Sequence, residues 1–275
     1  SRRFCRPSRT SPAQCVSAEL AISIEHSMSA VNFALGALAG AAATAVAADA
    51  YPSMMPSLGF SRPKDIELQY FDIAGAAEKV RFTLLMGGVP FKDTRVSFAD
   101  WGKMKETTKF GQLPLMYLNG EEKPYAQSGA MLRFAGAITG LMPKDPVQAF
   151  KVDEAIGLDE DLRREMRPSI MLSYDQTIKP KEKARKVKEM REKLAANEIP
   201  RFLSHFEKML ENSEYLCGSS ATIADAQFLT TCRWLGSGII DHIPADIMTK
   251  YPNITAFRAR MEAKPEIAAY LNKPK

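Results

Sequence analysis

The sequence predicts an α/β region followed by an all-helical region. A strand, a helix and a second strand are expected in quick succession from residue 66, and a hairpin and another helix follow them. Beyond Pro146 the apolar residues recur at helical spacing only. These observations predict an α/β plus all-α fold class, in the order βαβ, then ββα, then helices.

The first strand is expected at Ile66, Leu68 and Tyr70, which alternate with polar residues as in a half-buried strand. Residues 76–88 follow as a helix with Val80, Leu84 and Leu85 on one face, ending at Gly87-Gly88. Residues 91–98 are expected to form the second strand. Two strands so close together, joined by a helix, indicate a right-handed βαβ unit.

A hairpin comes next, because Asn119-Gly120 stands between the apolar run "LPLMYL" and "KPYA". A helix is expected from Ser128 through "GAMLRFAGAI". A βαβ unit followed by ββα is the thioredoxin-like topology. We therefore expect a thioredoxin-like domain at residues 63–145 and a helical domain at residues 146–275.

The helical region contains two distinctive segments. "NEIPRFLSHFEKMLEN" carries apolar residues at helical spacing, and Thr222 to Asp225 has the form of a capping box before an apolar run. Lys179–Lys193 is basic but interrupted by three glutamates. We interpret it as a solvated helix face, because a nucleic-acid or membrane surface would need aromatic residues or fewer acids.

Residues 1–62 differ in composition from the rest. The first twenty are rich in Ser and Arg with no acid before Glu19, and an Ala-rich run follows, then a linker at 52–63. We expect either a targeting-like segment or a disordered extension. Translation starts either before this sequence or at Met28, and in the second case the residues before Met28 are not part of the protein. The protein is then cytoplasmic, or plastid or organellar if the segment is a true targeting signal. A stable membrane span is not expected, since alanine and glycine are weakly apolar.

Composition excludes several function classes. With 37 basic and 32 acidic residues, the net charge of +5 does not indicate a nucleic-acid protein. The four cysteines form no CxxC pair, and Cys217 and Cys232 are expected to be buried thiols. The three histidines have no ligand spacing, so no metal site is expected.

Pro114 stands near the start of an apolar strand, where proline cannot donate to a sheet ladder. If the Leu113-Pro114 bond is cis, the main chain of Leu113 is offered to an extended peptide. Gln127 and Ser128 begin a helix, whose N–H groups suit a carboxylate. The alternative for the proline is an edge-strand position with a trans bond. For Ser128 it is a plain N-cap, a role that is compatible with binding. The first interpretation predicts a peptide ligand with an anionic end.

These residues resemble the glutathione transferases of the sigma-type, tyrosine-using cytosolic class. The resemblance covers about residues 64 to 273. It is carried by Tyr70-Phe71, Trp101 with Lys105, "FGQLP", "QSGAMLRF", "ATIADA" and "YPNITAFRARMEAKPEIAAYL".

The resemblance implies that Tyr70 is the catalytic residue, whose hydroxyl stabilises the thiolate of the co-substrate glutathione for attack on a small hydrophobic electrophile. It also implies that Asp161 of one subunit reaches the glutamyl ammonium of the glutathione bound to the other subunit, so a homodimer is expected. The implied binding positions are Trp101 and Lys105 for the glycine end, Gln112, Leu113 and Pro114 for the cysteinyl main chain, and Gln127 and Ser128 for the γ-glutamyl group.

One residue departs from the family pattern. Sigma members commonly carry an arginine six residues after the tyrosine, and here that residue is Ala76. The lost guanidinium predicts a less stabilised thiolate, or a different donor. For the electrophile, a pocket is expected between Ile73-Ala74 and a helix that carries methionines, although the same residues also suit a core: Met166, Ile170, Met171 and Tyr174.

Three alternatives to conjugation share this fold. Disulfide exchange is rejected, because residues 72–77 contain no cysteine. A non-catalytic glutathione-binding or structural relative is favoured by Ala76. The residues that count against it are Tyr70, Lys105, Gln127 and Ser128. A glutathione-dependent isomerase of the prostaglandin D synthase type would use the same thiolate, and the sequence does not separate it from a transferase.

Overall fold

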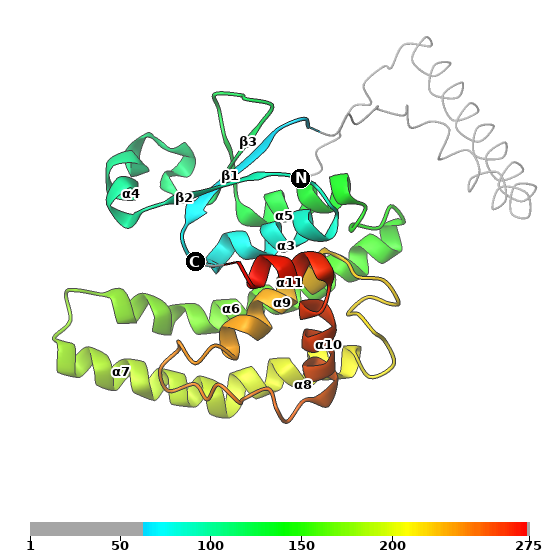
Figure 1. The fold of residues 1–275 in the computed structure, drawn as a ribbon. Coiled ribbons are helices and arrows are strands. Elements are labelled where there is room, and N and C mark those ends of the chain that lie inside the picture. Colours follow the sequence, from blue (N-terminus) through cyan, green and yellow to red (C-terminus); the bar gives the residue numbers. More distant parts are fainter. Residues whose placement is uncertain (1–62, 274–275) are drawn as a thin grey trace, which may run out of the picture. The chain divides into compact units, whose positions relative to one another are not determined.

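The computed structural model describes residues 63–273, so the expectations for residues 1–62 lie outside the described part of the chain. Its sheet has the strand order β2-β1-β3-β4 (Figure 1). The strands are β1 (Ile66–Phe71), β2 (Lys92–Val96), β3 (Leu115–Leu118) and β4 (Tyr125–Ala126). β1 pairs with β2 in parallel and with β3 antiparallel, and β3 pairs antiparallel with β4. This arrangement confirms the predicted βαβ-ββα topology.

Helix α3 (Glu78–Met86) connects the two apolar cores of the described chain. It follows the short 3₁₀ turn η1 (Gly75–Ala77) and packs against α5 (Ser128–Thr139) and α9 (Ile223–Leu235). Val80 and Leu84 pack with the sheet, whereas Phe82 belongs to the core of the helical region. The sheet and the helices are therefore held together through α3 (Figure 1).

The second strand is shorter than predicted. β2 ends at Val96, and Ser97 accepts a hydrogen bond from the Asp100 N–H, which starts α4 (Phe98–Met104). A serine at an N-cap stops the extended chain in this way. The 3₁₀ turns η2 (Lys105–Thr107) and η3 (Lys109–Gly111) lead from α4 towards β3.

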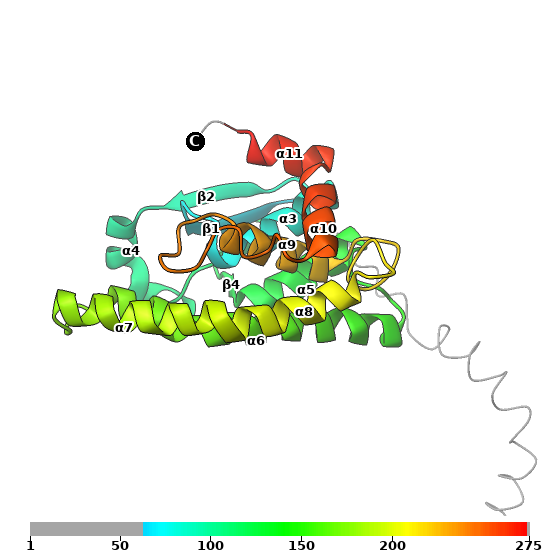
Figure 2. The same cartoon turned by 90° about the horizontal axis from the view of Figure 1, so that it is seen from below.

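After residue 146 the described chain is helical, as expected. α6 (Pro146–Tyr174) packs against α7 (Pro180–Lys193), which continues through a π turn (Leu194–Glu198) into α8 (Ile199–Met209). Figure 2 shows α6, α7 and α8 running along one side of the molecule. α10 (Pro252–Glu262) and α11 (Pro265–Leu271) complete this region. The division at residue 145 stays a prediction.

The structure confirms most local expectations for the helical region. The apolar face of α8 is buried, and the Asp225 carboxylate accepts a hydrogen bond from the Thr222 N–H at 2.7 Å. α7 is mostly exposed and carries ion pairs four residues apart, as a solvated face does. Cys232 is buried, but Cys217 is only partly buried. Between residues 63 and 273, no helix combines the length and apolarity needed to cross a membrane.

Candidate active site

Tyr70 lies one residue before the end of β1, with its ring in the core between the sheet and α3. Its hydroxyl oxygen accepts a hydrogen bond from the Ala76 N–H at 3.1 Å. Gly75, between them, has a φ of +47° and lies so close that an added Cβ would stand 2.5 Å from the Tyr70 hydroxyl oxygen. The main chain at the start of η1 therefore cradles the phenol.

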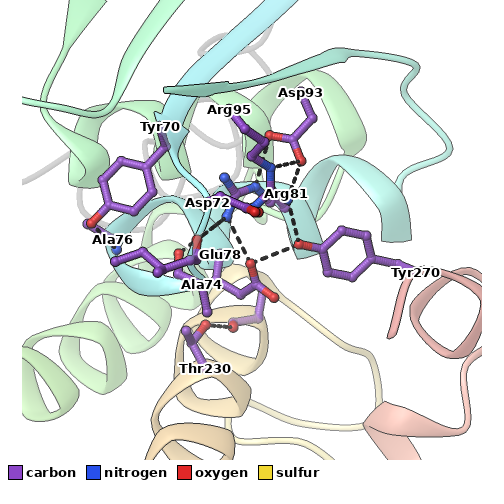
Figure 3. A network of polar contacts seen from close by, with 12 residues as sticks. Tyr70, Asp72, Ala74, Ala76, Glu78, Arg81, Asp93, Arg95, Thr230 and Tyr270 are labelled. Atoms are coloured by element: carbon purple, nitrogen blue, oxygen red, sulfur yellow. Dashed lines mark hydrogen bonds and ion pairs between the residues drawn. The ribbon is translucent and has the colours of Figure 1, made fainter. Parts of the chain in front are cut away.

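Arg81 hydrogen-bonds the main chain just before Gly75. Its side chain is fully buried, and Nη1 donates to the carbonyl oxygens of Ile73 at 3.0 Å and Ala74 at 3.3 Å. The same nitrogen contacts Glu78 Oε2 at 3.0 Å. The guanidinium carbon lies 5.8 Å from the centre of the Tyr70 ring. Figure 3 shows Arg81 among its polar partners, with Tyr70 beside this group.

The pairing of β3 brings two further segments to the same edge of the sheet. Leu115 is paired with Gln69 on one side and Ala126 on the other, so Leu113 and Gln127 lie beyond those pairs, at the end of β1 that carries Tyr70. The Leu113-Pro114 bond is cis, as the peptide-binding interpretation requires. Within residues 63–273, the N–H and C=O of Leu113 have no hydrogen-bond partner. They remain available to a ligand.

Helix α5 begins beside this main chain without a side-chain cap. Gln127 occupies the N-cap with a φ of 77°, and Ser128 is the first helical residue rather than a cap. The plain N-cap interpretation of Ser128 is therefore wrong. An uncapped helix start leaves N–H groups free and favours an anion. In the described chain, the side chains of Gln127 and Ser128 also have no polar partner.

Trp101, Lys105 and Gln112 come from the segment between β2 and β3. The Trp101 ring packs edge-on against Phe71 at the end of β1, with ring centres 5.9 Å apart, so α4 lies near the same edge of the sheet. Lys105 and Gln112 are exposed. Their side chains, like the Trp101 indole N–H, make no hydrogen bond or ion pair to any residue that the structure describes.

Comparison with known proteins identifies the family. Residues 170–274 match the family model described as "Glutathione S-transferase, C-terminal domain". Over 208 residues the chain is 30% identical to hematopoietic prostaglandin D synthase of Gallus gallus, which covers 75% of this chain and 95% of the relative. The chain belongs to the glutathione S-transferase family.

Two further relatives of this glutathione S-transferase support the assignment. Glutathione S-transferase 1 of Ascaris suum is 36% identical over 161 residues, covering 58% of this chain and 74% of the relative. The solved structure of prostaglandin synthase D of Nilaparvata lugens superposes with a TM-score of 0.66 at 26% identity, covering 77% of this chain and 99% of the other. The sigma-like subclass is compatible with these relatives.

Asp161 is exposed on α6 and paired with Arg164 at 2.5 Å. Its contact with a neighbouring subunit stays a prediction.

The adjacent Glu160 was not singled out from the sequence. Its carboxylate lies 3.9 Å from the position that a Cβ on Gly129 would take, and 3.8 Å from the Lys79 ammonium. Burial, and next the charge of Arg163, lower the pKa of Lys79. An acidic group of the same chain therefore stands beside the first turn of α5.

The structure divides the residues expected to line the electrophile pocket. Ile73, Met171 and Tyr174 are largely exposed, and Ile170 is partly buried against the helical core. Met166 is fully buried in that core, which confirms the core interpretation for this residue. Among residues 63–273, no cluster of three or more His, Cys, Asp or Glu side chains could hold a metal ion.

Sequence reasoning missed the polar group behind Tyr70. Glu78 and Arg81 are three residues apart on a helix, a spacing that usually indicates an exposed ion pair. Here the Arg81 side chain is completely buried and that of Glu78 nearly so. Tyr270 joins the group from α11, and its hydroxyl contacts Glu78 Oε2 at 3.0 Å across 192 residues of sequence. No local pattern signals a contact over that separation.

Proposed function

We propose that the protein transfers glutathione to small hydrophobic electrophiles, with the Tyr70 hydroxyl as the group that stabilises the attacking thiolate. The hydrogen bond from the Ala76 N–H to the Tyr70 oxygen is the observation that carries this proposal. A phenol donates one hydrogen bond and also accepts. Because the oxygen accepts from the main chain, its own proton is directed elsewhere and can be donated to a sulfur.

Stabilisation of the thiolate is the chemical purpose of this arrangement. A free thiol has a pKa of about 8.5, so most glutathione is protonated, and poorly nucleophilic, near neutral pH. A donor that bonds the charged sulfur favours ionisation. Ala76 lacks the arginine side chain that the resemblance implies at this position, and its N–H supplies a donor to Tyr70 from the main chain instead.

Glutathione is held at the sheet edge in this proposal. The unpaired main chain of Leu113, before Pro114, pairs with the cysteinyl main chain as an added strand would, with Gln112 beside it. The uncapped start of α5, with Gln127 and Ser128, takes the γ-glutamyl carboxylate.

The other end of the tripeptide is assigned to α4 and η2. Trp101 donates from its indole N–H, and the Lys105 ammonium pairs with the glycine carboxylate. Both groups are without a partner in the described part of the chain, which supports this assignment.

We test the function with a glutathione-affinity column and a conjugation assay with a chlorodinitrobenzene. Tyr70→Phe is expected to lower kcat by about one to two orders of magnitude, since the lost bond to a charged sulfur is worth about 2 kcal/mol. Tyr251→Phe is the matched control, because the Tyr251 hydroxyl donates to the Pro200 carbonyl in the helical region. Turnover unchanged by Tyr70→Phe would remove Tyr70 from this role. Absence of retention on the column would discard the binding site.

A glutathione-dependent isomerase is the second candidate, favoured by the relatives named as prostaglandin D synthases. It would use the same thiolate and differ in the apolar pocket. Parallel assays of conjugation and of prostaglandin isomerisation on one preparation separate the two. Retention on the column with neither activity would indicate a binding protein.

A homodimer completes the site in this proposal, with Asp161 directed at the glutamyl ammonium bound by the partner. Sedimentation at micromolar concentration measures the assembly. Asp161→Asn is expected to raise the glutathione KM several-fold with kcat kept, and an unchanged KM would remove Asp161 from the site.

The compartment is proposed to be the cytoplasm, or a plastid or other organelle if residues 1–62 act as a targeting segment. A fluorescent protein fused to residues 1–62 tests this. Diffuse cytoplasmic signal excludes the targeting role.

A further inference from the structure

A closed ring of polar side chains lies behind the loop that contacts Tyr70 (Figure 3). Arg81 Nε donates to Asp93 Oδ1 at 3.1 Å, and Arg95 Nη2 donates to Asp93 Oδ2 at 2.6 Å. Arg95 Nη2 lies 3.3 Å from the Tyr270 hydroxyl, which donates to Glu78 Oε2 at 3.0 Å. Glu78 Oε2 returns to Arg81 Nη1 at 3.0 Å. We call these five side chains the buttress ring.

The ring joins three elements, and α11 is remote in sequence from the other two. Glu78 and Arg81 come from α3, Asp93 and Arg95 from β2, and Tyr270 from α11. The ring also reaches the loop between β1 and η1, where Arg95 Nη1 lies 3.4 Å from Asp72 Oδ1. The loop therefore contacts the ring through the Asp72 side chain and through the carbonyls of Ile73 and Ala74.

Arg81 is the member that touches the site. Its Nη1 donates to the carbonyl oxygens of Ile73 and Ala74, which immediately precede Gly75 and Ala76. Arg81 thus holds the two peptide groups before the one whose N–H, that of Ala76, donates to the phenol. Arg81 also lies against the Tyr70 ring. It therefore contacts the Tyr70 ring and also the main chain that leads into Gly75 and Ala76.

We propose that the buttress ring positions the Tyr70 hydroxyl for thiolate stabilisation, and that the C-terminal helix α11 contributes to the site through the Tyr270 hydroxyl. This inference rests on the proposed glutathione transferase function. Its members are positioning residues, because none of them is placed against the tripeptide.

The chemistry of the ring supports a coupled unit. A buried guanidinium requires carboxylate partners, and removal of one leaves a charge without compensation. Arg81 has Glu78 and Asp93 as carboxylate partners, and its buried Nη2 has no hydrogen-bond partner among residues 63–273. Loss of either carboxylate would therefore leave the guanidinium charge poorly compensated. Burial, followed by the charge of Glu78, raises the pKa of Tyr270 to about 12. The phenol stays protonated at neutral pH and keeps donating to Glu78.

The first experiment compares Tyr270→Phe with the control Tyr251→Phe in the full-length protein. Each change removes one hydroxyl that makes a hydrogen bond, but only Tyr270 belongs to the ring. We expect Tyr270→Phe to lower kcat about threefold to tenfold and to move the pH midpoint of kcat/KM upward. The glutathione KM should stay within about twofold, because the proposed binding groups lie outside the ring.

The second experiment tests whether the ring acts as a unit. Tyr270→Phe and Arg95→Gln are measured singly and together, with Arg201→Gln as control, since Arg201 makes an ion pair on α8 away from the ring. Breaking a closed ring once should account for most of the loss, so the double variant is expected to be little worse than either single variant.

The outcomes separate the proposed function from the role of the buttress ring. An inactive wild-type protein would overturn the proposed function and this inference together. An active wild type in which Tyr270→Phe equals Tyr251→Phe would overturn the inference alone. A loss of thermal stability with no movement of the pH midpoint would show a merely structural role, and a rise in KM at constant kcat would show that the ring acts on binding.

Discussion

Gly75→Ala is the substitution for which the structure gives the sharpest expectation. The added Cβ would stand 2.5 Å from the Tyr70 hydroxyl oxygen and 2.7 Å from the ring carbon Cε1, whereas ordinary contact begins at 3.4 Å. From 2.5 to 3.4 Å, the hydroxyl has to retreat by about 0.9 Å. That movement disrupts the 3.1 Å bond from the Ala76 N–H. A misplacement of about 1 Å at a reacting group costs about a hundredfold in rate.

The positive φ of Gly75 adds a cost that has to be separated from the collision. An alanine in the left-handed region costs about 1–2 kcal/mol of stability. Gly88→Ala is the matched control, because Gly88 has a φ of +60° and nothing lies within 4 Å of its added Cβ. Both variants should melt at lower temperature. Only Gly75→Ala should lose turnover, by about tenfold to a hundredfold.

The assay is steady-state conjugation of glutathione across a range of pH, with melting followed by circular dichroism. We expect Gly75→Ala to raise the pH midpoint of kcat/KM as well as lower kcat, since a displaced phenol stabilises the thiolate less. If Gly75→Ala and Gly88→Ala kept equal turnover, the contact between the η1 main chain and the Tyr70 hydroxyl would have no part in the reaction.

Three other predictions concern the rest of the chain. Burial raises the pKa of Cys217 to about 12. Iodoacetamide should therefore label this thiol about a thousandfold more slowly than free cysteine at neutral pH, as measured by peptide mass spectrometry, and fast labelling would contradict this. Asp225→Ala leaves the Leu216 and Thr222 N–H groups unpaired and should destabilise by about 3 kcal/mol in urea unfolding, against about 1 kcal/mol for the exposed cap Asp145→Ala. The Gln69 amide is the main cause of a lowered pKa for Glu67. That carboxylate therefore stabilises the fold above its unfolded pKa and loses this effect as pH falls through the folded pKa, so the lower melting temperature of Glu67→Gln should vanish in acid.

The order of the elements could be predicted because its signals are local. Alternation in β1, the glycines after α3 and the Asn119-Gly120 turn each act within a few residues, and the structure bears them out. The end of β2 was misjudged, because the apolar Phe98 looked like a continuation of the strand. Ser97 instead begins α4, and the Phe98 ring stacks on Phe71 at 4.6 Å.

The interior of the site was less predictable, because burial of a charged residue depends on partners that are far away in sequence. Arg81 in isolation looks like an exposed helix residue, and only Asp93 and Glu78 together make its complete burial tolerable. Met166 shows the same limit for an apolar residue. Its helix borders the expected pocket, but the side chain packs into the helical core, and the sequence pattern does not distinguish the two faces.

The alanine at position 76 removes a side chain without removing a donor. A guanidinium would bring both hydrogen bonds and charge to the phenol, whereas the Ala76 N–H brings a hydrogen bond and the partial positive charge of a helix start. The Arg81 guanidinium lies 5.8 Å from the centre of the Tyr70 ring, and its charge is balanced by Glu78 and Asp93. The groups proposed to hold the tripeptide at Leu113 and at α5 are also main-chain groups. A site built in this way depends on the course of the backbone more than on side-chain identity.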